Sequence, residues 1–117
     1  MTPDNRQQAR DFLVGTHQLS PAEAEEALGV AAAVLRTGLS GLAEAIRTGD
    51  GAQCAEQAHA LKGNLLNLGL PDLAALAALA MEPARTNDFE AIREMATNLT
   101  NALDSFWERG HARGGTL

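Results

Sequence analysis

The sequence predicts an all-α protein: an up-down-up-down antiparallel four-helix bundle with an extra short helix at the N-terminus. Three observations favour this fold class. Ala and Leu, both strong helix formers, dominate the apolar residues, whereas aromatic residues make up 3% and Tyr is absent. Apolar residues recur at steps of three and four, which places them on one side of an α-helix. Glycine and proline separate these segments by short turns, so consecutive helices must run antiparallel.

The first two helices are separated by a connection over residues 15–19. Thr2-Pro3 can begin the short N-terminal helix, which we expect to pack outside the bundle with an apolar stripe of Ala9, Phe12 and Leu13. Ser20-Pro21-Ala22-Glu23 is a capping box that begins a long helix ending at Gly49. Its expected core residues are Leu28, Ala31, Leu35, Leu42 and Ile46. Internal glycines weaken this helix, and the sequence leaves open whether Gly29, Gly38 or Gly41 interrupts it.

The third helix has the most regular pattern in the chain. Asp50 can cap its start, with Gln53 three residues later, and Gly69 can cap its end. Its apolar residues follow steps of four, three, four and three, and they are Cys54, Ala58, Leu61, Leu65 and Leu68. This spacing predicts one core-facing seam on an α-helix.

Two further helices complete the predicted bundle. Pro71 opens a helix to about residue 82 that Pro83 should end or kink, with Leu73, Leu76, Ala77 and Ala80 facing inward. Asn87-Asp88-Phe89-Glu90 caps a last helix ending at Gly110, with inward residues Phe89, Ile92, Ala96, Leu99, Leu103 and Phe106. We therefore expect one domain over 1–117, a core bundle over about 20–109 and a flexible tail over 110–117.

Composition excludes several classes of protein. The net charge is −6 and no basic patch stands out, which argues against nucleic acid and anionic membrane surfaces as partners. The polar N-terminus is unlike a signal peptide, and no run of 18 uninterrupted apolar residues suggests a transmembrane helix. One cysteine, Cys54, cannot form an internal disulfide, so we expect a reduced, cytoplasmic setting. Because the bundle closes its own core, we expect a monomer.

His59 occupies an unusual position on the third helix. At about 100° per residue, it lies about 200° from the core residue Leu61 and therefore points to solvent. Lys62 and Gly63 lie within about 60° of His59 on the same outward face. Ala55, Glu56 and Leu66 lie on or beside this face, and Leu66 is an apolar residue that the core seam does not explain. We predict that these three residues form a docking surface for a partner protein.

These residue types suit phosphoryl transfer. A neutral imidazole is nucleophilic near pH 7, and its nitrogen can hold a phosphoryl group. An ammonium beside it can offset the charge of the phosphoryl oxygens, and a glycine leaves room for the reacting group of a second protein. Metal binding is not predicted, because His17, His59 and His111 fall on separate segments. Serine or cysteine catalysis is not predicted either, since Cys54 lies on the core seam and no Ser has a neighbouring His and acid.

The run H-A-L-K-G-N-L-L-N-L-G over residues 59–69 resembles the histidine phosphotransfer (HPt) family of bacterial two-component phosphorelays. The resemblance implies that His59 is the phosphoacceptor, that Lys62 assists by its charge and that Gly63 gives access. It also implies a phosphorelay intermediate without its own ATP site, which accepts the group from a receiver-domain aspartate or a histidine kinase and passes it to another receiver. The implied partners are a response-regulator receiver domain and a hybrid sensor histidine kinase. No cofactor is expected on this chain, and Mg²⁺ is expected on the receiver.

An alternative is a degenerate member of the same family that docks a receiver without carrying phosphate. Several members place an imidazole-orienting Gln on the next helix, and by alignment that position is Met81, which cannot donate a conventional hydrogen bond. This departure favours the alternative. Transfer from a phosphorylated receiver to the chain would separate the two hypotheses.

Overall fold

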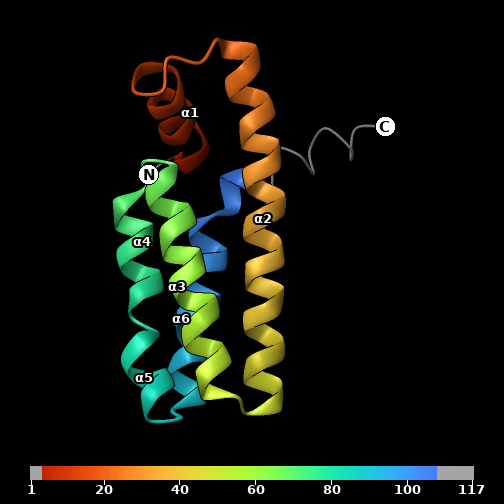
Figure 1. The fold of residues 1–117 in the computed structure, drawn as a ribbon, viewed down its shortest axis with the longest axis vertical. Helices are drawn as coiled ribbons and strands as arrows, with labels where there is room; N and C mark the ends of the chain where they lie inside the picture. Colours follow the sequence, from red (N-terminus) through yellow and green to blue (C-terminus); the bar gives the residue numbers. More distant parts are fainter. Residues whose placement is uncertain (1–3, 108–117) are drawn as a thin grey trace.

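The computed structural model describes residues 4–107, and within that range all regular structure is helical (Figure 1). The described helices are α1 (Asn5–Gly15), α2 (Pro21–Thr48), α3 (Gly51–Asn67), α4 (Pro71–Ala78), α5 (Met81–Arg85) and α6 (Phe89–Ala102). Helix α2, helix α3, the pair α4 and α5, and helix α6 alternate in direction along the long axis (Figure 1). The predicted all-α bundle is therefore confirmed.

Helix α2 runs without interruption past all three of its internal glycines. Its start is the predicted capping box, in which the side chains of Ser20 and Glu23 each accept a hydrogen bond from the other's backbone. Two of the glycines have a structural reason. A Cβ at Gly38 would lie 2.9 Å from Leu61 Cδ2, and one at Gly41 would lie 3.0 Å from the Gln57 side chain. The missing side chains therefore let α2 approach α3 closely.

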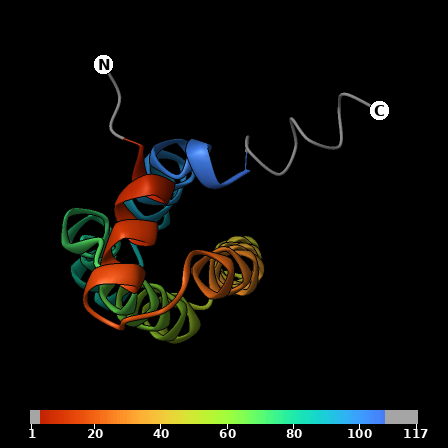
Figure 2. The same ribbon diagram turned by 90° about the horizontal axis from the view of Figure 1, so that it is seen from above.

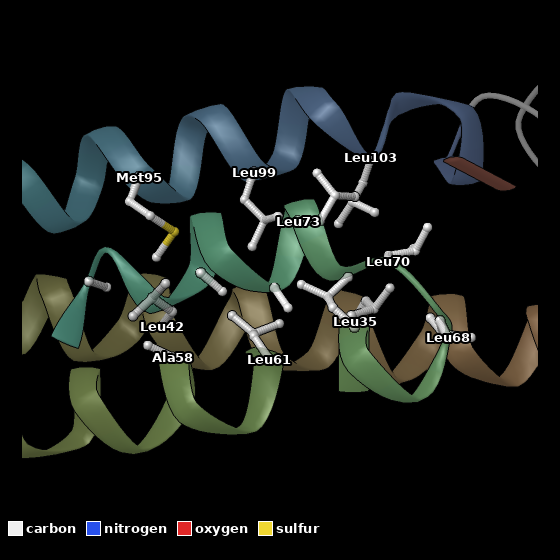
Figure 3. Close-up of a cluster of buried hydrophobic side chains, with 14 of the residues drawn as sticks. Leu35, Leu42, Ala58, Leu61, Leu68, Leu70, Leu73, Met95, Leu99 and Leu103 are labelled. Atoms are coloured by element: carbon white, nitrogen blue, oxygen red, sulfur yellow. The ribbon is translucent and has the colours of Figure 1, made fainter. Parts of the chain in front are cut away.

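The hydrophobic core lies in the centre of the bundle, where side chains from α2, α3, α4 and α6 meet (Figure 3). All five seam residues predicted for the third helix are buried. Four residues predicted to face inward are only partly buried, namely Ala31, Leu76, Phe89 and Ala96. Met95, which the stepwise pattern omitted, is buried and points into the same cluster.

The helix predicted over 71–82 is divided into α4 and α5 by a turn at Leu79 and Ala80. Proline lacks an N–H, and its ring crowds the carbonyl four residues earlier, which here belongs to Leu79. The break therefore comes four residues before Pro83 rather than at it. Pro83 itself lies in the first turn of α5, where a proline is tolerated.

Helix α1 lies across one end of the bundle rather than along its side (Figures 1 and 2). Its predicted start at Thr2-Pro3 lies outside the described residues, and Asp4 caps the helix by accepting a hydrogen bond from the Gln7 N–H. Asn5 donates to the carbonyl of Ala102, and the backbone N–H of Arg6 donates to Ser105 Oγ. The helix therefore closes the bundle end by contacts with the segment that follows α6.

The chain after α6 bends, which corrects the prediction of one continuous last helix. Helix α6 ends at Ala102, and a separate helical turn covers 104–107. The Trp107 indole N–H donates to the carbonyl of Thr100, and Phe106 is buried beneath the Arg6 guanidinium. The predicted stop at Gly110 and the tail over 110–117 lie outside the described residues.

Helix α2 is long and apolar enough to cross a membrane by length and composition, although it contains no uninterrupted run of 18 apolar residues. It is a core helix of the bundle, because Leu28, Leu35 and Leu42 are fully buried against the other helices. However, only 28% of its most apolar stretch is buried. Among the large apolar residues of this helix, Val30 and Val34 are exposed.

Candidate functional site

Helix α3 is well defined at both ends, which fixes the position of its central residue, His59. The Asp50 side chain caps the start by accepting a hydrogen bond from the Gln53 N–H at 3.0 Å. At the other end Gly69 has a φ of +71°, and the Leu70 N–H donates to the Leu65 carbonyl at 3.0 Å. This left-handed glycine stop satisfies carbonyls that the helix end would otherwise leave free.

Close packing fixes α3 on two flanks. Helix α2 reaches it through Gly38 and Gly41, as described above. On the other flank, a Cβ added to Gly51 would lie 2.6 Å from the carbonyl oxygen of Ala84, so the start of α3 touches α5. The inner seam is buried, and the remaining side of α3 faces outward. A helix fixed in this way presents its outward residues in a constant geometry.

His59 and Gly63 lie on this outward side, as the helical spacing predicts. The His59 side chain is exposed, and in the part of the chain that the structure describes no group forms a hydrogen bond or ion pair with it. Gly63 is also exposed, and a Cβ there would find nothing within 4 Å. The helix backbone next to the imidazole is therefore open to an approaching molecule.

Lys62 is half-buried rather than fully exposed. It is three residues from His59, so their side chains are neighbours on the helix surface. Within residues 4–107 it forms no ion pair, which leaves its ammonium available to an anion at the imidazole. A half-buried stem with a free head group restricts where that charge can lie.

The three residues predicted to dock a partner differ in how exposed their side chains are. Glu56 is exposed and Leu66 keeps 47% of its surface accessible, whereas Ala55 is half-buried. Met81, the residue that the sequence resemblance aligns with the family's glutamine, is partly buried and packs against the core. No hydrogen-bonding side chain therefore replaces that glutamine at position 81.

Sequence reasoning missed two apolar residues on α2. Val30 and Val34 are 62% and 44% exposed, and neither belongs to the predicted core positions of that helix. The sequence already contained a sign of this exposure, because both valines are apolar but do not share the three- and four-residue spacing of the predicted core residues of that helix. Val34 lines a small pocket between α2 and α3 together with Asn64 and Asn67.

Other reactive side chains lie away from this face. Cys54 is fully buried, and desolvation together with the Asp50 carboxylate raises the pKa of its thiol, so the nucleophilic thiolate is disfavoured. His17 is exposed in the turn before α2, where its ring contacts Phe12 edge-on. Within residues 4–107 no group of three His, Cys, Asp or Glu side chains could hold a metal ion. His111 lies outside the described residues.

The fold and this surface together define a class of protein, a small helical bundle with an exposed imidazole in the middle of its third helix. The model of the Hpt domain family matches residues 16–108. The chain belongs to the Hpt domain family, which confirms the resemblance found in the sequence. Members of this family are helical carriers of phosphoryl groups in phosphorelays, lack a kinase ATP site and interact with receiver domains and kinases. No curated protein and no solved structure matches the chain.

Proposed function

We propose that this chain is a phosphorelay intermediate that carries a phosphoryl group on His59. The observation that supports the proposal most directly is the open position of this imidazole, which is exposed beside a glycine with no atom within 4 Å of its missing Cβ. The Lys62 ammonium, one turn away, is the group we assign to the phosphoryl oxygens. A fixed α3 holds these groups in place before the partner arrives, which reduces the entropy lost on encounter.

The proposed step is an in-line displacement. A ring nitrogen of neutral His59 attacks the phosphorus of a receiver's aspartyl phosphate, and the nitrogen–phosphorus bond forms as the bond to the aspartate oxygen breaks. The electron pair of that bond leaves with the aspartate as carboxylate, and the imidazole releases its other N–H proton to water. A loose transition state needs positioning and charge neutralisation more than covalent help. We expect the receiver to supply the Mg²⁺, and the reverse reaction delivers the group to another receiver.

Mixing the chain with phosphorylated receiver domains tests this proposal. A panel of receiver domains from the same organism is labelled with radioactive phosphate and incubated with the wild-type chain. We expect an acid-labile label on the wild type with at least one receiver and none on His59→Gln. His17→Gln is the matched control, since it removes another exposed imidazole and should leave the label unchanged. Labelling of His59→Gln, or no labelling of the wild type, would contradict the proposal.

The same assay separates the alternative function. A docking module without chemistry would bind a receiver and accept no label. Met81 favours that function because its thioether, packed against the core, cannot fix the imidazole as an amide would. The open position of Gly63 favours transfer, because a pure adaptor has no need of free space beside the imidazole. We also expect no label from ATP alone.

A further inference from the structure

A groove between α2 and α6 takes no part in the proposed phosphoryl transfer. It has a volume of 330 Å³ and lies away from His59, because α6 and α3 occupy opposite sides of the bundle (Figure 2). Sites for small molecules have volumes of about 300–1,000 Å³, are mostly apolar and are often found between the helices of bundles. The groove is therefore large enough to hold a small molecule.

The groove is elongated, and its floor is apolar. Helices α2 and α6 run antiparallel (Figure 1), and each contributes residues from three successive turns. The residues that define its length are Leu39, Ala43 and Ile46 of α2, and Arg93, Ala96 and Thr100 of α6. On each helix the first and last of these are seven positions apart, which corresponds to about 10.5 Å along the axis. A floor of this shape suits a linear hydrocarbon chain better than a compact ligand.

The groove is bounded at the end where Leu39 and Thr100 lie. The Trp107 indole N–H donates to the carbonyl of Thr100 at 3.1 Å, and the guanidinium carbon of Arg36 lies 4.9 Å from the Trp107 ring centroid. Because Arg36 belongs to α2, this stack bridges the two helices just beyond the groove. The chain contains one tryptophan, so a molecule that enters the groove would change the environment of a single indole.

Arg93 places a positive charge at the opposite end of the groove. Among the described residues that line the groove it is the only charged one, and within residues 4–107 it forms no ion pair or hydrogen bond. Glu90, one turn earlier on α6, is exposed and is not paired with it. The planar guanidinium can bind both oxygens of a carboxylate. Since the net charge of the chain is −6, most of the remaining surface repels an anion.

We propose that this groove binds a linear carboxylate of medium chain length, with the hydrocarbon chain along the apolar floor and the carboxylate on Arg93. Binding removes the exposed apolar surface of Leu39, Ala43 and Ala96 from water. The guanidinium donates two parallel hydrogen bonds to the carboxylate oxygens. His59 stays accessible, because the groove lies on the other side of the bundle. The inference therefore does not depend on the proposed function.

Octanoate is the probe, and two related molecules separate the contributions of its two parts. The neutral 1-octanol has the same chain length without the charge, and acetate has the charge without the chain. Isothermal titration calorimetry measures each Kd, and Trp107 fluorescence reports whether the molecule enters the groove. We expect one octanoate per chain with a change in Trp107 emission, and no detectable binding of acetate. Binding of 1-octanol should be about tenfold weaker, because a charged hydrogen bond is lost.

Three variants lower the net charge by the same amount and locate the site. Arg93→Gln removes the cation, and Ala43→Glu places a carboxylate on the floor of the groove. Ala33→Glu is the matched control, since Ala33 is also an exposed alanine of α2 but does not line the groove. We expect Arg93→Gln and Ala43→Glu to raise the Kd for octanoate by about tenfold or more, and Ala33→Glu to stay within about twofold. Circular dichroism verifies that each variant is folded.

Several outcomes would overturn the proposal. They are no octanoate binding to the folded wild type, equal binding of octanoate and 1-octanol, and equal octanoate binding by Ala43→Glu and Ala33→Glu. A dimer in analytical ultracentrifugation that Ala43→Glu abolishes, Ala33→Glu retains and octanoate does not dissociate would assign the groove to a second copy of the chain. Labelling of His59 by a receiver is a separate measurement, so failure of either proposal is distinguishable from failure of the other.

Discussion

The inner and outer sides of helix α3 differ in the requirements that their residues meet. On the inner side, Cys54, Ala58 and Leu61 have no exposed surface, and neighbouring helices limit their size and shape. On the outer side, His59 and Gly63 contact nothing in the described chain that requires an imidazole or a glycine. The inner residues are explained by the stability of the bundle. The outer residues need an explanation from outside the chain, which the proposed partner supplies.

Glycines show the same contrast. At Gly51 and Gly69 a Cβ would lie within 2.7 Å of atoms of Ala84 and Phe12, so packing excludes any side chain there. At Gly63 and Gly29, both in mid-helix, a Cβ would meet nothing within 4 Å. Folding would gain from alanine at both open positions. The comparison therefore identifies positions where stability is given up, and only Gly63 lies beside His59.

The largest expected effect on stability comes from the inner side. Leu61→Ala should reduce the free energy of unfolding by about 2–5 kcal/mol, because it removes a fully buried side chain and leaves a cavity. Urea unfolding followed by circular dichroism measures this change. Phosphate transfer per folded molecule should remain near the wild-type rate. A loss of transfer without a loss of stability would show that the two sides of α3 are not separable.

A smaller effect is expected at the end of the helix. Gly69→Ala should destabilise the protein by on the order of 1–3 kcal/mol, from backbone strain at φ +71° and the clash with Phe12. Gly49→Ala is the matched control, since its φ is +70° but its Cβ would meet nothing within 4 Å. The difference between their unfolding free energies measures the Phe12 contact alone, and equal values would refute the clash.

The open glycines give the sharpest comparison. Gly63→Ala and Gly29→Ala should each stabilise the protein by about 0.5–1 kcal/mol, as expected for alanine in a helix interior. Only Gly63→Ala should slow transfer from the receiver. Gly29 is nine residues from Gly38, about 180° around the helix, so it faces away from α3. Thermal unfolding and receiver transfer on both variants check this, and equal transfer rates would remove Gly63 from the site.

The smallest effect on stability is expected at Lys62. Lys62→Ala should change the unfolding free energy by no more than about 0.5 kcal/mol, as is usual for a surface substitution with no ion pair. Transfer should slow by about tenfold, because a charged hydrogen bond to the phosphoryl group is lost. Lys62→Arg, which keeps the charge, should recover part of the rate. Wild-type rates for Lys62→Ala in rapid-quench measurements would exclude the lysine from the reaction.

Much of the fold could be predicted because it follows from local chemistry. Capping residues Ser20 and Asp50 begin helices where expected, and the five-residue seam of the third helix is buried as its spacing requires. Helix ends were less predictable. The break before Pro83 comes from its ring crowding the Leu79 carbonyl, which apolar periodicity does not register. The bend at Leu103 accompanies the hydrogen bond between Arg6 and Ser105, two residues far apart in the chain.

The candidate site was predictable in part for the same reason. Exposure of His59 and Gly63 follows from their angle to Leu61 on a single helix, so one periodic pattern suffices. The pocket beneath Asn64 was not predictable, because it needs the register between α2 and α3. That register depends on Gly38 and Gly41, whose pairing with Leu61 and Gln57 is visible only once the helices are packed.

The sequence by itself determined that this chain is a helical bundle with an imidazole, an ammonium and a bare stretch of backbone on one outward line, because those properties repeat with the helical period. Only the tertiary structure decided which glycines serve packing and which lie open, and which apolar residues of α2 stay exposed. These depend on contacts between residues far apart in the chain, and such contacts are set by the fit of whole helices against each other.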